Sequence, residues 1–171
     1  MSDRELWKFI NTFAPWFSAL GSLAAVITAL YLARRERTVD LKITAGVRVV
    51  AAPPQSPEWC VYVEVVNRGR RRAVVDGIVW RLPRLLSEYE YAWIPAANPL
   101  SAQIPSTLED GARARFVGPL AGFTTHFRDV VGTGWTRHIK ARLLRVAVTT
   151  STGWRFERRV EKGLRKALIN K

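Results

Sequence analysis

The sequence predicts a mainly β fold, an antiparallel β-sandwich that follows one N-terminal apolar helix, and three observations support this prediction. Residues 9–33 contain no charged side chain. Most of the remaining chain divides into short runs of alternating apolar and polar residues, separated by Pro, Gly and Asn, and such runs are typical of half-buried strands. Only one or two short stretches show helical spacing, so we expect two sheets to pack on each other.

The uncharged stretch 9–33 is predicted to be a single transmembrane helix. At about 1.5 Å per residue a helix of this length crosses a hydrocarbon layer of roughly 30 Å. A signal peptide is the first alternative, but Asp3 and Glu5 offset Arg4 and Lys8, and arginines follow the stretch, so we expect no cleavage. An amphipathic surface helix is the second alternative, but it would need a polar face, which this stretch lacks. A buried core helix is the third alternative, and it stays open.

The flanks of this helix predict its interface contacts and its orientation. Aromatic rings near both ends suit the membrane interface, and more cations follow the helix than precede it, so we expect a cytoplasmic C-terminal domain at an inner membrane. The residues predicted to anchor the helix at the interface are Trp7, Trp16, Tyr31, Arg34, Arg35 and Arg37.

Small residues repeat along the same helix. Their spacing lets two helix backbones approach closely, so a homo-oligomer is one interpretation, although small residues are common in membrane helices. The predicted helix–helix contact consists of Ser18, Gly21, Ser22, Ala25 and Ala29.

Charge and cysteine content limit the partners and the compartment. The net charge is +13, and residues 1–33 contribute none of it. A basic domain held near a membrane attracts anionic lipid, nucleic acid or an acidic protein, whereas solubility is the simplest explanation of the charge. The single cysteine, Cys60, cannot form an internal disulfide, which fits a reducing compartment.

The chain is predicted to divide into five segments. The last of them repeats Val160, Leu164 and Leu168 among lysines and arginines, which indicates a basic amphipathic helix that lies either on the membrane or on the domain. The segments are a short N-terminal segment (1–8), the transmembrane helix (9–33), a basic linker (34–38), the β-sandwich domain (39–160) and the amphipathic tail (161–171).

Within the domain, turn residues separate the expected strands. Asn67 and Gly69 are expected to supply the positive φ of a tight turn, and Gly77 a β-bulge. Tyr89, Tyr91 and Trp93 share one face, either as part of the core or as the wall of a groove. The predicted elements are strands at 39–50, 59–66, 73–82 and 112–116, a short crossover helix at 120–131, and a hairpin of strands at 138–149 and 154–160.

These six strands and the extended run that carries Tyr89, Tyr91 and Trp93 make about seven, which predicts an Ig-like sandwich, although the Cys, Trp, Cys pattern of antibody domains is absent. The strings VYVEVVNRGRRRAVVDGIVW, LEDGARARFVGPL and VAVTTSTGWRF resemble uncharacterised bacterial and phage membrane proteins. Those proteins join one N-terminal helix, ending in arginines, to a cytoplasmic Ig-like domain. The resemblance implies this architecture and no catalytic residues.

The composition argues against an enzyme. His126, His138 and Cys60 are too few for a structural zinc site, and the Gly132–Gly134 segment lacks the lysine of a phosphate-binding loop. A nucleophilic pair of Cys60 and His138 is the remaining catalytic option, but Cys60 lies in an apolar strand, where an inert core residue is expected. We therefore predict no catalytic residue, no metal and no cofactor.

The arginines are then the candidate functional residues, because guanidinium groups suit phosphates and carboxylates. We expect a membrane-anchored, non-enzymatic interaction or scaffold protein, an accessory subunit that binds a protein partner through its basic domain. The alternative is a module that recognises nucleic acid or anionic lipid. The predicted patch comprises Arg68, Arg70, Arg71, Arg72, Arg113, Arg115, Arg155, Arg158 and Arg159.

Overall fold

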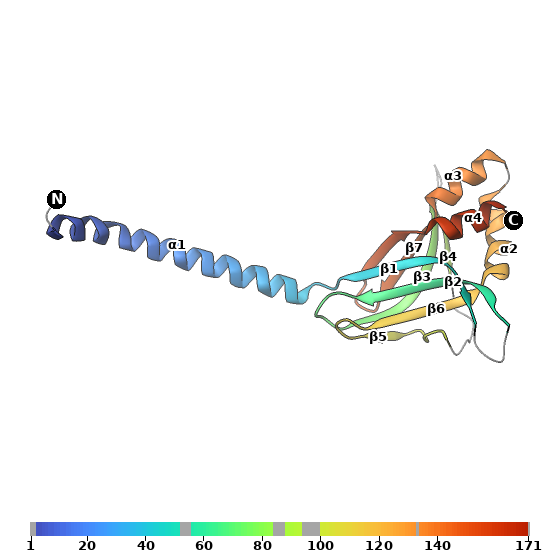
Figure 1. Ribbon diagram of the computed structural model, residues 1–171, viewed down its shortest axis with the longest axis horizontal. Helices are drawn as coiled ribbons and strands as arrows, with labels where there is room; N and C mark the ends of the chain where they lie inside the picture. Colours follow the sequence, from blue (N-terminus) through green and yellow to red (C-terminus); the bar gives the residue numbers. More distant parts are fainter. Residues whose placement is uncertain (1–2, 52–55, 84–87, 94–99, 133, 171) are drawn as a thin grey trace. The chain divides into compact units, whose positions relative to one another are not determined.

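A computed structural model describes residues 3–51, 56–83, 88–93, 100–132 and 134–170 (Figure 1). The chain divides into two compact units, Met1–Thr38 and Val39–Lys171, and we call the second the β unit. Across the described ranges the chain forms eight strands and four helices, and all strand pairs are antiparallel. The prediction of a mainly β, antiparallel fold behind one apolar helix is confirmed.

The first unit is a single helix, α1 (Asp3–Arg37). By length and composition alone, its stretch Phe13–Arg34 could cross a membrane, and none of its most apolar window is buried. Trp16 and Phe17 expose 70% and 73% of their surface. Because α1 begins upstream of the predicted residue 9, Pro15 lies in the helix interior, where it removes one backbone hydrogen bond.

Sheet A of the β unit has three strands in the order β1 (Leu41–Val50), β2 (Glu58–Asn67) and β6 (Arg113–Pro119). The alternation of apolar and polar residues along β1 and β2 places the apolar ones on the inner face of the sheet. Leu41, Ile43 and Ala45 are buried and pair with a row of buried residues on β2.

Sheet B has five strands. Four follow the order β4 (Glu88–Ala92), β3 (Ala73–Pro83), β7 (Arg145–Thr150) and β8 (Arg155–Arg159), and β5 (Ser106–Leu108) pairs with the start of β3. The register of β3 against β7 shifts between Val75 and Gly77, so the bulge predicted at Gly77 is confirmed.

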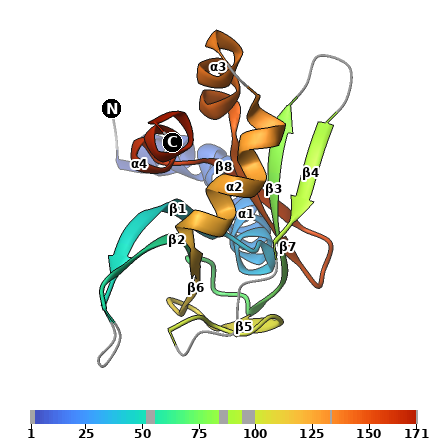
Figure 2. The ribbon, with the colours of Figure 1, turned by 90° about the vertical axis from the view of Figure 1, so that its right-hand side faces the viewer.

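Three helices gather at the end of the β unit opposite the start of β1 (Figures 1 and 2). They are α2 (Leu120–Val131), α3 (Trp135–Leu143) and α4 (Lys162–Asn170). The predicted helix 120–131 matches α2, which follows sheet A and leads through α3 to β7 in sheet B. Leu164 and Leu168 of α4 are buried, so the tail helix packs on the β unit and offers lipid no apolar face there.

One hydrophobic cluster joins the inner faces of both sheets to these helices. Its centre is Trp80, which is fully buried and meets the rings of Phe123 and Trp93 edge-on at 4.7 Å and 5.9 Å between centroids. Gly118 of β6 makes room for Trp93, because an added Cβ would lie 2.8 Å from Cζ2 of that ring. The aromatic row Tyr89, Tyr91 and Trp93 therefore belongs to the core and its margin.

The strand predicted at 138–149 is wrong in its first half. Residues 135–143 form α3, and only residues 145–150 form a strand. The alternation of Lys140 and Arg142 suggested a strand, whereas Trp135, Ile139 and Leu143 recur every fourth residue, which is the period of one helix face.

The explanation offered for the Asn67 turn is also wrong. Among the described residues, positive φ occurs only at Gly111, Gly132, Gly134 and Gly153, so neither Asn67 nor Gly69 supplies it. Gly111 and Gly153 do adopt positive φ, in the turn before β6 and in the β7–β8 hairpin. The contribution of Asn67 is a set of side-chain hydrogen bonds, described below.

Candidate functional site

The nine arginines predicted as one patch lie in three places. Five of them, Arg68, Arg70, Arg71, Arg72 and Arg113, are exposed at the end of the β unit where β1 begins. Arg115 lies two residues further along β6, on the outer face of sheet A, and its Nε donates to Glu64 at 3.2 Å. Arg155, Arg158 and Arg159 belong to β8 at the edge of sheet B. Only the first group forms a patch.

We call the first place the basic end. It contains the start of β1 and three turns, 67–72, 109–112 and 151–154, which lie together in Figure 1. Lys42 and Arg113 flank Val66 from its two neighbouring strands, so the basic group extends onto sheet A. Within this group Arg72 pairs with Glu109 at 3.4 Å, and both of these side chains are more than 60% exposed.

Asn67 holds the turns of the basic end together. Its side chain is fully buried, and Nδ2 donates to the carbonyl oxygens of Arg71 at 2.8 Å and Leu108 at 3.1 Å. Its Oδ1 accepts the N–H of Gly69 at 3.0 Å. Its backbone N–H donates to Ala112, and its carbonyl accepts from Gly111. One buried amide thus fixes the arginine turn against the 109–112 turn.

The arginines of β8 have a different environment. On the outer face of sheet B, Arg155 bridges Glu90 of β4 at 2.7 Å and Glu157 at 3.3 Å, and Arg81 of β3 also pairs with both carboxylates. The hydrogen bond from Arg155 lowers the pKa of Glu90 below its ordinary value. These ion pairs satisfy Arg155 across the strands, so we assign it a structural role.

A second ion pair lies on the outer face of sheet A. Arg48 of β1 donates to both carboxylate oxygens of Glu161, at 2.8 Å and 3.0 Å, and lies 5.8 Å from the centre of the Tyr62 ring. The hydrogen bond to Glu161 raises the pKa of Arg48. Gly46 leaves room for this pair, because a Cβ there would overlap the Glu161 carboxylate.

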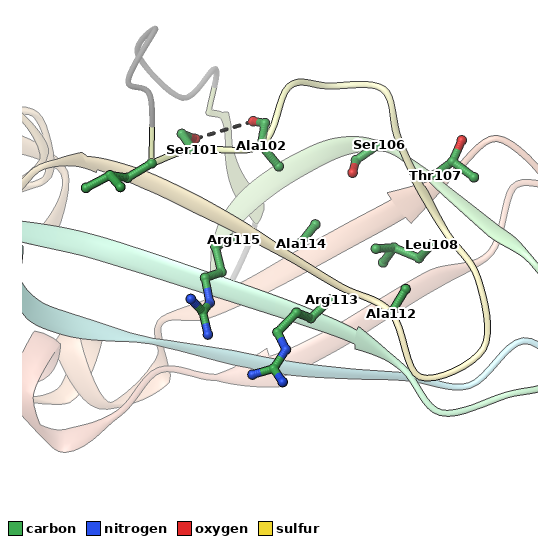
Figure 3. Close-up of a pocket in the computed structure, with 10 residues that line it drawn as sticks. Ser101, Ala102, Ser106, Thr107, Leu108, Ala112, Arg113, Ala114 and Arg115 are labelled. Carbon is green, nitrogen blue, oxygen red and sulfur yellow. Dashed lines mark hydrogen bonds between the residues drawn. The ribbon is translucent and has the colours of Figure 1, made fainter.

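A groove of about 650 Å³ lies between β6 and the segment 100–108 (Figure 3). Its lining includes the hydroxyl residues Ser101, Ser106 and Thr107 and the apolar Leu108. Figure 3 shows Arg113 and Arg115 running to one side of β6, with Ser106 and Thr107 on the other side. The described residues that line this groove include no histidine, cysteine or carboxylate.

The residues considered for chemistry lie apart from that groove. Cys60 is buried, and burial raises the pKa of its thiol, which disfavours the reactive thiolate. His126 packs on Tyr91 at 4.0 Å and shares a hydrogen bond of 3.0 Å with the hydroxyl of Tyr89. Among the residues described, no three His, Cys, Asp or Glu side chains are grouped so that they could hold a metal ion.

The structure shows one surface that the sequence analysis missed. Trp135, Ile139 and Leu143 lie on one face of α3 and expose 75%, 44% and 38% of their surface. We call these three residues the α3 stripe. Their four-residue spacing was the signal that could have identified them, but residues 138–149 were interpreted as a strand.

The predicted anchor residues lie on α1. Trp16, Tyr31 and Arg34 are exposed, and the side chains of Trp7, Arg35 and Arg37 lie outside the described part of the chain. Ser18, Gly21, Ser22, Ala25 and Ala29 are all exposed, and a Cβ on Gly21 would meet nothing within 4 Å. The Ser22 hydroxyl donates to the Ser18 carbonyl at 3.0 Å, so this polar group is satisfied within the helix.

Comparison with known proteins gives little to add. No protein-family model matches the chain, and no curated protein matches it. An X-ray structure of a structural genomics consortium target aligns with 74% of this chain and 84% of its own, at 10% identity and a TM-score of 0.30. The crystal structure of a Bordetella pertussis protein provisionally named ApaA aligns with 72% of this chain and 89% of its own, at 18% identity and a TM-score of 0.26. Neither similarity supports an argument about this chain.

Proposed function

We propose that this chain is a single-pass membrane protein that holds a non-enzymatic interaction domain at the membrane surface. The apolar stretch Phe13–Arg34 supports the anchor, because a helix with so much exposed apolar surface requires an apolar environment. The basic linker after it favours a cytoplasmic β unit at an inner membrane. This is also the architecture of the uncharacterised bacterial and phage proteins that the sequence resembles.

The β unit is proposed to be an Ig-like β-sandwich. Two antiparallel sheets contribute to one core, and the strands of each sheet bury alternate residues, which supports this proposal. An experimental structure that shows a closed barrel, or a strand order unlike that of Ig domains, would contradict it.

The α3 stripe is the single observation that carries the partner-binding proposal. An exposed tryptophan with two aliphatic neighbours on one helix face resembles the anchors at the centre of protein interfaces. Arg142, exposed on the same helix, would contribute to a polar rim. We propose that a protein partner covers this face of the membrane-anchored β unit.

Differential co-purification from detergent tests this function. The full chain should retain one stoichiometric protein in a salt-insensitive manner, and Trp135→Ser with Ile139→Lys should abolish that retention. Trp59→Ser with Val49→Lys is the matched control, because these paired residues of β2 and β1 expose 61% and 51% of their surface. Equal capture by both double variants would contradict the proposal.

The anchor and its orientation need a separate test. The full chain should resist extraction from membranes at alkaline pH. In a Cys60→Ser background, a cysteine introduced at the exposed Ser151 should stay unlabelled by a membrane-impermeant thiol reagent in intact cells. Labelling in intact cells would place the β unit on the outer side, and release at alkaline pH would remove the anchor.

The small-residue face of α1 is proposed to mediate homo-oligomer formation. Its residues are exposed, and the space around Gly21 is open. Gly21→Ile should weaken crosslinking of the full chain in detergent, whereas Leu23→Ile, on a neighbouring position of the helix, should not. Equal crosslinking of both variants would contradict this contact.

A further inference from the structure

The basic end combines more positive charge than its own carboxylates balance. Six basic side chains lie there, Lys42, Arg68, Arg70, Arg71, Arg72 and Arg113, all exposed. The carboxylates of the same end are Asp40, Glu109 and Asp110, also exposed. Six basic side chains therefore face three carboxylates, and one of these, Glu109, pairs with Arg72.

The backbone of the basic end is fixed. The hydrogen bonds of Asn67 tie the arginine turn to the 109–112 turn, and Arg68 N–H donates to the carbonyl of Asp40 at 2.7 Å. The arginines therefore project from an ordered surface, and their grouping does not depend on a chance loop conformation.

An exposed tryptophan lies at the same end. Trp154 closes the β7–β8 hairpin, and 53% of its surface is exposed. Ser151 in this hairpin donates its N–H to Val74 at the start of β3, which places the hairpin beside the arginine turn. Tryptophan rings favour the boundary between lipid head groups and hydrocarbon.

We propose that the basic end is a binding site for anionic lipid head groups of the bilayer that α1 spans, and this inference rests on the proposed function. Covalent connectivity supports it. The apolar stretch ends at Arg34 and β1 begins at Leu41, so at most roughly 25 Å of extended chain separates them. The basic end, which contains the start of β1, thus stays within reach of the head groups.

The chemistry favours lipid phosphate over nucleic acid. Each arginine presents a planar fork that matches a phosphate, and a juxtamembrane cation near an anionic leaflet gains about one kcal/mol, or roughly fivefold in binding. Single-strand binders place several aromatic rings along a basic groove, whereas the described part of the basic end has Trp154 alone. The α3 stripe lies at the opposite end of the β unit, so both sites can be occupied together (Figure 1).

The test uses the full chain in lipid nanodiscs. A fluorophore is attached to Ser151→Cys in a Cys60→Ser background, and quenching by a head-group quencher lipid reports docking. Discs contain either phosphatidylcholine alone or phosphatidylcholine with phosphatidylglycerol. The charge variant carries Arg68→Gln, Arg70→Gln, Arg72→Gln and Arg113→Gln. The matched control removes four exposed charges elsewhere, through Arg142→Gln, Arg158→Gln, Arg159→Gln and Lys166→Gln.

Quenching should be strong in anionic discs, weak in neutral discs and reduced by salt. The charge variant should lose it, with a docking constant lowered on the order of a hundredfold or more, while the control keeps it. Quenching that is independent of lipid charge, or lost equally in both variants, would overturn the inference. A DNA duplex added to the chain in neutral discs is a further arm of the test. If the duplex binds the parent chain but not the charge variant, and no docking to anionic lipid occurs, the site belongs to nucleic acid. Failure of the chain to enter discs would instead reject the anchor, and with it the proposed function.

Discussion

Replacement of Asn67 by alanine gives the most direct test of how the fold builds its basic end. The Asn67→Ala change removes three side-chain hydrogen bonds, to backbone groups of Arg71, Leu108 and Gly69. The turn then loses the side-chain contacts that fix its backbone. Because Asn67 is fully buried and Leu108 is nearly so, water cannot easily replace the lost bond to the Leu108 carbonyl.

The expected loss of stability follows from these bonds. A typical intramolecular hydrogen bond contributes about 1 kcal/mol net, so three bonds predict a loss of about 3 kcal/mol in the free energy of unfolding. With a urea dependence of about 2 kcal/mol per molar, the unfolding midpoint should fall by about 1.5 M.

Urea unfolding of the full chain in a non-ionic detergent measures this loss. Fluorescence of the buried Trp80 and Trp93 reports the β unit. Arg68→Ala, at the adjacent exposed position, is the control and should lie within about 0.5 kcal/mol of the parent chain. If Asn67→Ala is as stable as that control, the hydrogen bonds of Asn67 do not hold the turn, and our explanation of it is refuted.

Three further predictions follow from close contacts and shifted pKa values. Gly118→Val should destabilise the β unit by about 1 to 3 kcal/mol, because its Cβ meets the ring of Trp93, and an unchanged urea midpoint would show that the core has free space there. Because the pKa of Glu90 is lowered, the ionised carboxylate stabilises the fold at neutral pH, and this contribution is lost as the pH falls below the ordinary glutamate value of 4.5. The difference in urea midpoint between the parent chain and Glu90→Gln should therefore shrink on acidification. A difference that stays constant between pH 7 and pH 3 would contradict the role of Arg155. The Cys60 thiol should react with a thiol reagent at pH 8 only slowly in the folded chain and rapidly in urea, and rapid reaction of the folded chain would contradict its burial.

Two signals in the sequence, the alternation of apolar and polar residues and a long stretch without charge, predict much of this fold. The apolar stretch after residue 9 predicts a helix, and alternation over 39–50, 59–66 and 73–82 predicts three strands close to their observed bounds. These signals work because each residue's face depends only on its neighbours along the same element. The crossover helix 120–131 was recognised for the same reason.

Local pattern failed where two periods competed. In residues 138–143 polar and apolar side chains alternate, as in a strand, but the apolar Ile139 and Leu143 are also four residues apart, as on one face of a helix. Tertiary packing selects the helix. Buried Ala141 lies against the rest of the β unit, while Trp135 and Ile139 remain outside. The α3 stripe was missed as a direct consequence, because the predicted strand began after Trp135 and would have placed Ile139 and Leu143 on its buried face.

The sequence by itself determined that this protein has an apolar N-terminal helix, a strand-rich basic portion and an excess of arginine. These are properties of composition and short-range order. Only the tertiary structure decided which arginines lie together, because their grouping depends on strand register and on the contacts of distant turns. Register places Arg113 beside the turn of Arg68 and leaves Arg155 paired with Glu90, three strands away. The spacing of these arginines along the sequence does not reveal which of them lie near one another in the fold.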